Sequence, residues 1–213
     1  MRTLLLITTA ALLPAQLPGA GPIWDFAAVG GGSFYLSKTV TSESAKASTG
    51  FRTGFAGGLI LGHEMYRNIG GEIRYLFLKN DMKVSGNGES ATFSAQSHAI
   101  HYDLLFYTAP PESAVRPFIA IGGGGKYYRG TGTEPAYQPL SQLVLLSKAD
   151  QWSGMLAAGA GFKVALRSGL HLRLEFRDYM TPLPKKLLTP NSGAELSGWL
   201  HNFVPMLGIG VTF

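Results

Sequence analysis

The chain has 213 residues and a formal net charge of +5, yet only 15% of its residues are charged. Ordinary soluble domains carry roughly 25% charged residues, so this composition is unusual for a soluble enzyme. The chain contains no cysteine, which excludes disulfides, thiolate metal sites, a cysteine nucleophile and a lipidated cysteine. Since the positive charge forms no basic block, we expect no nucleic-acid partner.

The N-terminal segment is typical of a secretory signal peptide. A positive start at Arg2 is followed by the apolar run LLLITTAALL (4–13) and by small residues up to Ala20. The run is too short for a transmembrane helix, which needs roughly 20 residues. We predict a signal peptide over residues 1–20 and one exported barrel domain over 21–213. A buried N-terminal helix is the other interpretation of the run.

Eight strand-like segments without helical periodicity follow. Gly, Ser, Thr, Tyr, Phe and Val dominate them, and they cover residues 24–40, 51–64, 68–83, 91–107, 115–129, 151–166, 169–181 and 199–213. The connections between them are alternately long and short. Transmembrane up-and-down barrels have long loops outside and short turns on the periplasmic side. The pattern therefore predicts an all-β fold, an eight-stranded antiparallel up-and-down transmembrane β-barrel.

The stretch LHLRLEFRDYM (170–180) raises the question of which strand face is the inside. Leucines and Phe176 alternate with His171, Arg173, Glu175 and Arg177. On other segments the second face carries small residues and isolated charges, which suits the narrow lumen of an eight-stranded barrel. A lipid-facing Arg or Lys costs roughly 2–4 kcal/mol at the bilayer midplane, so we expect the charges inside. A periplasmic lipocalin-like ligand-binding barrel, with the charges in water, is the alternative.

Strand parity predicts a polar network in the lumen. Its members are Glu72, Arg74, Asp103, Arg116, Lys126, Lys163, Arg173, Glu175 and Arg177. Cations outnumber carboxylates in this set, so each carboxylate is expected to balance more than one cation, because buried charges persist only when paired. The amphipathic rings of Trp152 and Trp199 are expected at the loop-side membrane interface, and Trp24, Tyr107 and Phe213 near the turn side.

We predict no catalytic, metal or cofactor site. His101 and Asp103 share a strand face, but metal ligation or acid–base catalysis needs a third converging group. The lipid A deacylase type of barrel uses His-x-Ser, and no histidine here has a serine two residues later. A Ser–His–Asp arrangement from separate strands stays open. The glycine runs at 30–32 and 122–125 lack the Lys-Ser/Thr that completes a phosphate-binding loop.

The order of "RPFIAIGGG", "LRLEFRDY" and a terminal "GVTF" after a signal peptide resembles the OmpA-like, opacity-type outer-membrane β-barrel proteins of Gram-negative bacteria. The resemblance covers essentially the whole mature chain. It implies a monomer in the outer membrane. Its partners would be membrane lipid and lipopolysaccharide, the barrel assembly machinery and periplasmic chaperones. In that family the assembly machinery recognises a C-terminal strand ending in Phe, which Leu207, Ile209, Val211 and Phe213 match.

The function expected from these features is a structural or interaction role through the extracellular loops, without enzyme or general porin activity. Loops 130–150 and 182–198 are the longest and are the expected contact surfaces. The alternative within the same fold is a barrel enzyme that modifies lipid A or phospholipids.

Overall fold

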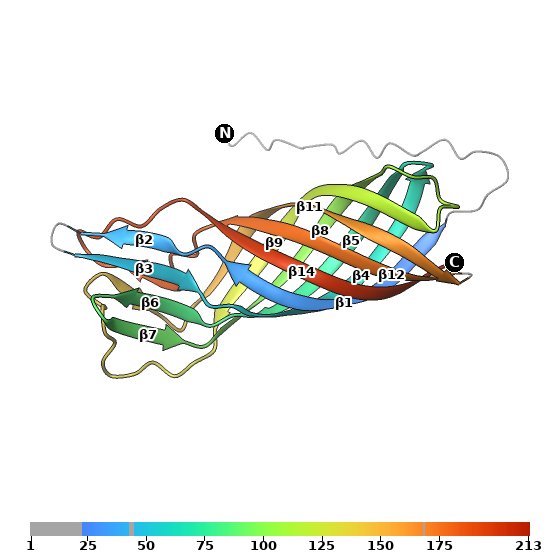
Figure 1. Ribbon diagram of the computed structural model, residues 1–213. Coiled ribbons are helices and arrows are strands. Elements are labelled where there is room, and N and C mark those ends of the chain that lie inside the picture. Colours follow the sequence, from blue (N-terminus) through green and yellow to red (C-terminus); the bar gives the residue numbers. More distant parts are fainter. Residues whose placement is uncertain (1–22, 43–44, 168) are drawn as a thin grey trace, which may run out of the picture.

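The computed structural model describes residues 23–42, 45–167 and 169–213 (Figure 1). The predicted signal peptide lies outside these residues. Within them, no helix has the length and apolar character needed to cross a membrane. The secondary structure is built from strands.

Eight antiparallel strands close into a barrel, as the sequence predicts. They are β1 (Trp24–Tyr35), β4 (Gly54–Tyr66), β5 (Ile69–Lys79), β8 (Ala95–Tyr107), β9 (Val115–Gly130), β11 (Asp150–Arg167), β12 (Leu170–Pro182) and β14 (Trp199–Thr212). Each strand pairs with its neighbour in this order, and β1 closes the barrel against β14. At the closure the backbone N–H of Trp24 donates to the carbonyl of Phe213 at 2.8 Å. The described ends of the chain therefore meet at the end of the barrel that carries the short turns.

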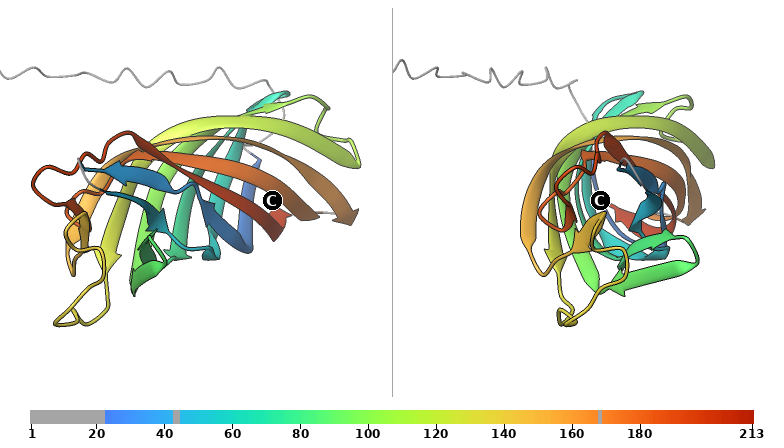
Figure 2. Two further views of the ribbon diagram at one scale, coloured as in Figure 1. Left: turned by 60° about the vertical axis from the view of Figure 1, so that its left-hand side comes forward. Right: turned by 90° about the vertical axis from the view of Figure 1, so that its left-hand side faces the viewer.

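The long connections fold into a second unit, which we call the cap. It comprises a four-stranded sheet of β2 (Lys38–Thr41), β3 (Lys46–Phe51), β6 (Met82–Gly86) and β7 (Glu89–Phe93), and the pair β10 (Val144–Leu146) and β13 (Leu188–Pro190). The cap lies beyond the end of the barrel opposite to the short turns (Figures 1 and 2).

The cap corrects the predicted strand limits. The sequence predicts single strands over 24–40, 68–83 and 91–107, but each divides into a barrel strand and a cap strand. Buried positions keep the same parity from β5 into β6 and from β7 into β8, so periodicity alone does not show where the chain leaves the barrel there. Between β1 and β2 the parity shifts by one residue, from Ser33 to Val40. Asn80 holds one division in place, because its side-chain amide donates to the carbonyls of Ser33 at 3.2 Å and Arg52 at 2.8 Å.

The cap has its own hydrophobic core. Val40, Met82, Val84, Val144, Leu146, Leu187, Leu188 and Leu200 are among its fully buried members. Burying a side chain of this size contributes about 1.5–3 kcal/mol relative to leaving it exposed. The long connections are thus a packed layer, not a set of independent loops.

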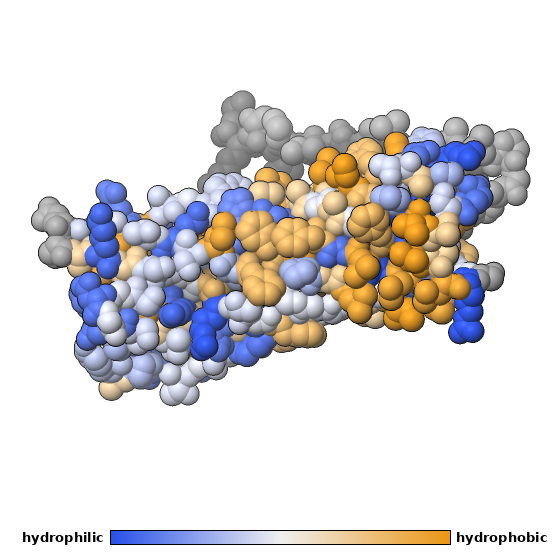
Figure 3. All heavy atoms as spheres, viewed as in Figure 1, coloured by the Kyte–Doolittle hydropathy of each residue, from blue (hydrophilic) through white to orange (hydrophobic). Residues whose placement is uncertain are grey.

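The two faces of the barrel strands differ as predicted. On β12, Leu174 and Phe176 are 45% and 52% exposed on the outer surface, whereas Arg173 and Arg177 are fully buried. Hydrophobic side chains gather over the barrel and hydrophilic ones over the cap (Figure 3). The charges are inside and the leucines outside. This is the reverse of what a soluble, lipocalin-like barrel requires.

Candidate functional site: the charged barrel interior

Six ionised side chains from β5, β8 and β12 meet in the middle of the lumen. This central cluster consists of Glu72, Arg74, Asp103, Arg173, Glu175 and Arg177, all with almost fully buried side chains. It balances three guanidinium groups against three carboxylates. Near charge balance is the condition under which buried ions are tolerated in a low-dielectric interior.

Each carboxylate of the central cluster has more than one nitrogen partner. Glu72 accepts from Arg74 Nη1 at 3.0 Å, from Arg173 Nη2 at 2.7 Å and from Arg177 Nη2 at 2.9 Å. Glu175 accepts from the same three arginines. Asp103 lies 2.9 Å from Arg177 Nη1 and 2.8 Å from His101 Nδ1. These contacts tie β5, β8 and β12 together across the lumen.

Glycines on β9 and β11 leave the room that the central cluster occupies. A Cβ at Gly122 would collide with Asp103, and one at Gly161 would lie 2.8 Å from Glu175 Cβ. Phe118 also packs against the cluster, with the Arg173 guanidinium 4.8 Å from its ring centroid. Such a cation–π contact adds to the stabilisation of a desolvated guanidinium. The glycine-rich faces noted in the sequence thus have a packing reason.

Arg116 and Lys163 lie inside the barrel but outside the central cluster, nearer the short turns. Arg116 pairs with Glu64 and stacks on Tyr107, with 3.7 Å from the guanidinium carbon to the ring centroid. Lys163 pairs with Asp25. Sequence reasoning missed both carboxylates. The sequence also predicts Tyr107 at the turn-side membrane interface, but its ring is buried in the lumen. The reason is that Tyr107 lies on the face of β8 that points into the barrel.

Lys126 has a different environment from the other predicted network members. It is fully buried near the cap, and its ammonium donates to the hydroxyl of Tyr35 at 2.8 Å. Among the described residues it forms no ion pair with a carboxylate. The ring of Tyr128, 5.3 Å away, provides a further cation–π contact. Lys126 is therefore part of a hydrogen-bonded layer beneath the cap and not of the ion-pair network.

Side chains fill the lumen in successive layers. The ion pairs near the short turns are followed along the barrel by the central cluster, by apolar side chains such as Leu76 and Leu78 together with the hydrogen-bonded Lys126, and by the core of the cap. This agrees with an interior that is only wide enough for side chains in an eight-stranded barrel. The arrangement joins the strands across the lumen.

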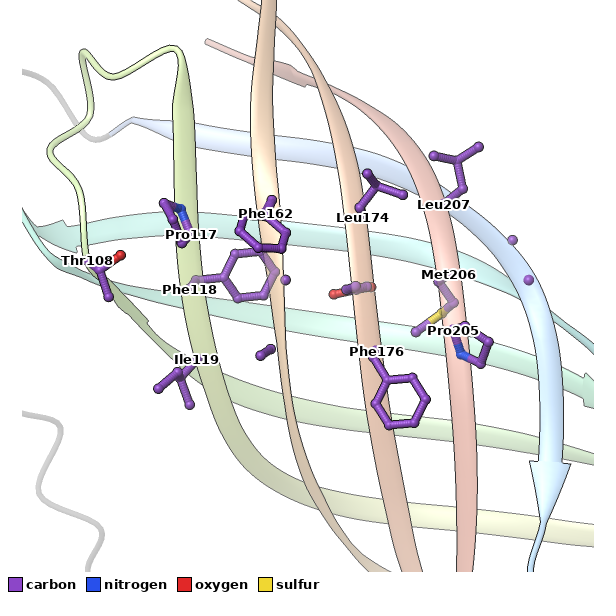
Figure 4. Close-up of a pocket in the computed structure, with 15 residues that line it drawn as sticks. Thr108, Pro117, Phe118, Ile119, Phe162, Leu174, Phe176, Pro205, Met206 and Leu207 are labelled. Atoms are coloured by element: carbon purple, nitrogen blue, oxygen red, sulfur yellow. The ribbon is translucent and has the colours of Figure 1, made fainter.

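An apolar groove of about 770 Å³ crosses the outer face of β9, β11, β12 and β14 (Figure 4). It is lined by Phe162, Leu174, Phe176 and Leu207, and by the small side chain of Ala160. The outward side chains of this groove offer no charged group. Chemically the groove suits a hydrocarbon chain.

Two histidines on the outer face each lie beside a polar group of a neighbouring strand. His98 Nδ1 is 2.8 Å from the hydroxyl of Tyr75, and His201 Nδ1 is 2.7 Å from Asp178 Oδ2. Asp178 is an exception to the rule that charges lie inside. Among the described residues, no serine or threonine hydroxyl is hydrogen-bonded to His201, and no group of three His, Cys, Asp or Glu residues could hold a metal.

No family model and no curated protein matches the chain in sequence. Solved structures match it in fold. Neisserial surface protein A (NspA) is 12% identical with a TM-score of 0.56, and the match covers 91% of this chain and 100% of that one. A major outer membrane protein from Thermus thermophilus is 14% identical with a TM-score of 0.56 and the same coverages.

Outer membrane protein AlkL, solved in lipid bilayers, is 14% identical with a TM-score of 0.51. That match covers 94% of this chain and 95% of that one. At such identities the likeness shows the fold alone. The chain has the fold of small outer-membrane β-barrels, and the resemblance drawn from its sequence is confirmed at that level.

Proposed function

We propose that this chain is an integral outer-membrane protein whose cap faces the cell exterior as an interaction surface, and whose barrel does not conduct solutes. The observation that carries the proposal is a packed cap on a barrel with an apolar outer face and a filled lumen. A cap with its own core presents a fixed surface, so that a partner would not have to order free loops on binding.

The orientation follows from the ends of the barrel. Short turns and both described chain ends lie at one end, which in barrels of this type faces the periplasm. Exposed aromatic rings occur towards both ends: Trp24 and Phe213 at the turn side, Trp152 and Trp199 at the cap side. Their distribution supports two membrane interfaces separated by the apolar belt.

The proposed partners follow from the same surfaces. Membrane lipid and lipopolysaccharide would surround the belt. The barrel assembly machinery and periplasmic chaperones would act on the unfolded chain, with Leu207, Ile209, Val211 and Phe213 as the assembly signal. All four of these side chains are outward and exposed in the folded barrel. We propose that the protein functions as a monomer.

A lipid-modifying enzyme is the alternative within this fold. The pair of His201 and Asp178 resembles a base with its orienting carboxylate, but nucleophilic catalysis also needs a hydroxyl or an activated water beside the histidine. If the protein is an interaction protein and not an enzyme, the lipid A mass spectra of cells with and without it should be identical. A mass change that disappears in His201→Ala would favour the enzyme.

Cysteine labelling on intact cells tests the orientation. Because the chain has no native cysteine, each introduced cysteine is the unique site for a membrane-impermeant maleimide. Ser141→Cys and Ser192→Cys lie in the cap and should label from outside, whereas Ser113→Cys lies in the turn between β8 and β9 and should not. The opposite pattern would overturn the topology.

A further inference from the structure

A surface pocket of about 510 Å³ lies where β9 and β11 leave the barrel towards the cap. It is lined by Tyr127, Asp150, Gln151, Trp152 and Lys186. Trp152 pairs across the strands with Tyr127, and the next outward pair is Asp150 with Arg129. The pocket therefore joins the aromatic edge of the apolar belt to the charged surface of the cap.

Trp152 gives the pocket a flat apolar wall. Its side chain is 66% exposed, and its ring centroid lies 5.2 Å from that of Tyr127 with the planes tilted by 38°. The ring lies over Gly125, where an added Cβ would come within 3.2 Å of it. One ring face is thus supported by the strand, and the other is free to stack on the apolar face of a sugar ring, as amphipathic rings do at an interface.

Lys186 gives the pocket positive charge. Its backbone N–H donates to the side-chain carbonyl of Gln151 at 3.0 Å, which fixes the loop beside the strand. In the part of the chain that the structure describes, Lys186 forms no ion pair. The carboxylate of Asp150 is instead 3.8 Å from Arg129. An exposed ammonium without a carboxylate partner is available to a phosphate.

Below the pocket the lipid-facing surface is suited to hydrocarbon. Leu156 and Ile121, four residues from Trp152 on β11 and six from Tyr127 on β9, are 53% and 50% exposed. Between them and the pocket, Gly154, paired with Gly125, leaves open space on the outer face. A ligand that uses all three features has a phosphate, a sugar ring and acyl chains. We infer that the pocket binds the phosphorylated glycolipid headgroup of the outer leaflet, lipid A, with its acyl chains over the belt. This inference rests on the proposed orientation of the cap.

Native mass spectrometry of the purified full chain in neutral detergent tests the site. The probes are bisphosphorylated lipid A, the same lipid without phosphates, and phosphatidylglycerol. Lys186→Gln and Trp152→Ala should each raise the Kd for bisphosphorylated lipid A by about tenfold. Removing the phosphates should weaken binding to the parent and abolish the effect of Lys186→Gln.

Matched controls carry the same changes elsewhere on the cap side. Lys83→Gln, on β6, and Trp199→Ala, at the start of β14, should change the Kd by less than about twofold. Equal effects of the site variants and these controls would overturn the inference. A second result would also overturn the inference: phosphatidylglycerol binds as tightly as lipid A, and Trp152→Ala does not change its Kd. That result would show that the protein attracts any anionic lipid. The assay does not depend on cellular orientation, so a failure of the proposed topology would appear separately, in the labelling of Ser141→Cys.

Discussion

Glu175→Gln is the substitution that most directly perturbs the central cluster. The carboxylate accepts from Arg74 Nη1 at 2.9 Å and from the Nε atoms of Arg173 and Arg177, both at 3.2 Å. Glutamine keeps the shape of the side chain but removes its charge. Its amide NH2 group, which can only donate hydrogen bonds, would replace one of the oxygens that accept from the arginines. Three guanidinium groups would then face only Glu72 and Asp103.

Removing one partner of a buried ion pair typically costs about 3–5 kcal/mol, because the remaining charge is left uncompensated. We expect Glu175→Gln to lower the free energy of unfolding of the barrel by that amount, measured by urea titration in lipid vesicles. Glu195→Gln is the matched control, since its side chain is exposed in the cap and an exposed charge contributes about 0–1 kcal/mol. An effect of Glu175→Gln no larger than that of the control would refute the buried network.

Four further predictions concern the lumen, the strand packing, the cap and the last strand. In planar bilayers the purified protein should give no stable ohmic pore, since an aqueous channel needs about 16–18 strands; reproducible large conductance would contradict the filled lumen. Gly31→Ala should destabilise the barrel in urea because its Cβ would collide with the carbonyl of Pro205, whereas Gly154→Ala, with open space, should not. Leu188→Ala should weaken the cap core by about 2–5 kcal/mol and expose the cap to protease while the barrel stays folded; loss of the barrel as well would show that the two units are not separable. Phe213→Ala should reduce the yield of folded barrel in cells but not the stability of the purified protein, and unchanged yield would argue against an assembly signal.

The barrel could be predicted from sequence because the features that indicate it lie within single strands and the connections between them. The alternation in LHLRLEFRDYM assigns each side chain to a face, and in the structure Arg173 and Glu175 lie inside while Leu174 is outside. The number of alternating segments predicts the number of strands. The alternation of long and short connections predicts that consecutive strands are neighbours in the barrel. These features need no knowledge of contacts between distant parts of the chain.

The cap and the pairing of charges depend on distant contacts. β3 pairs with β6 across more than thirty intervening residues, as Thr49 opposite Val84 shows, and neither hairpin carries a signal that separates it from the barrel. Lys163 and Asp25 come from β11 and β1, which are not neighbours in the sheet, so they meet only across the closed lumen. Strand parity places a charge inside but does not name its partner.

The central claim is that the leucine face of the strands contacts lipid while the charged face is enclosed. Spin labels on Leu174→Cys and Ile209→Cys, outward on β12 and β14, test it in vesicles against a label on Ser192→Cys in the cap. Both barrel labels should be accessible to oxygen, which concentrates in the bilayer, and protected from a water-soluble nickel chelate, whereas the cap label should show the reverse. Nickel accessibility of the barrel labels equal to that of the cap label would contradict a membrane-embedded belt.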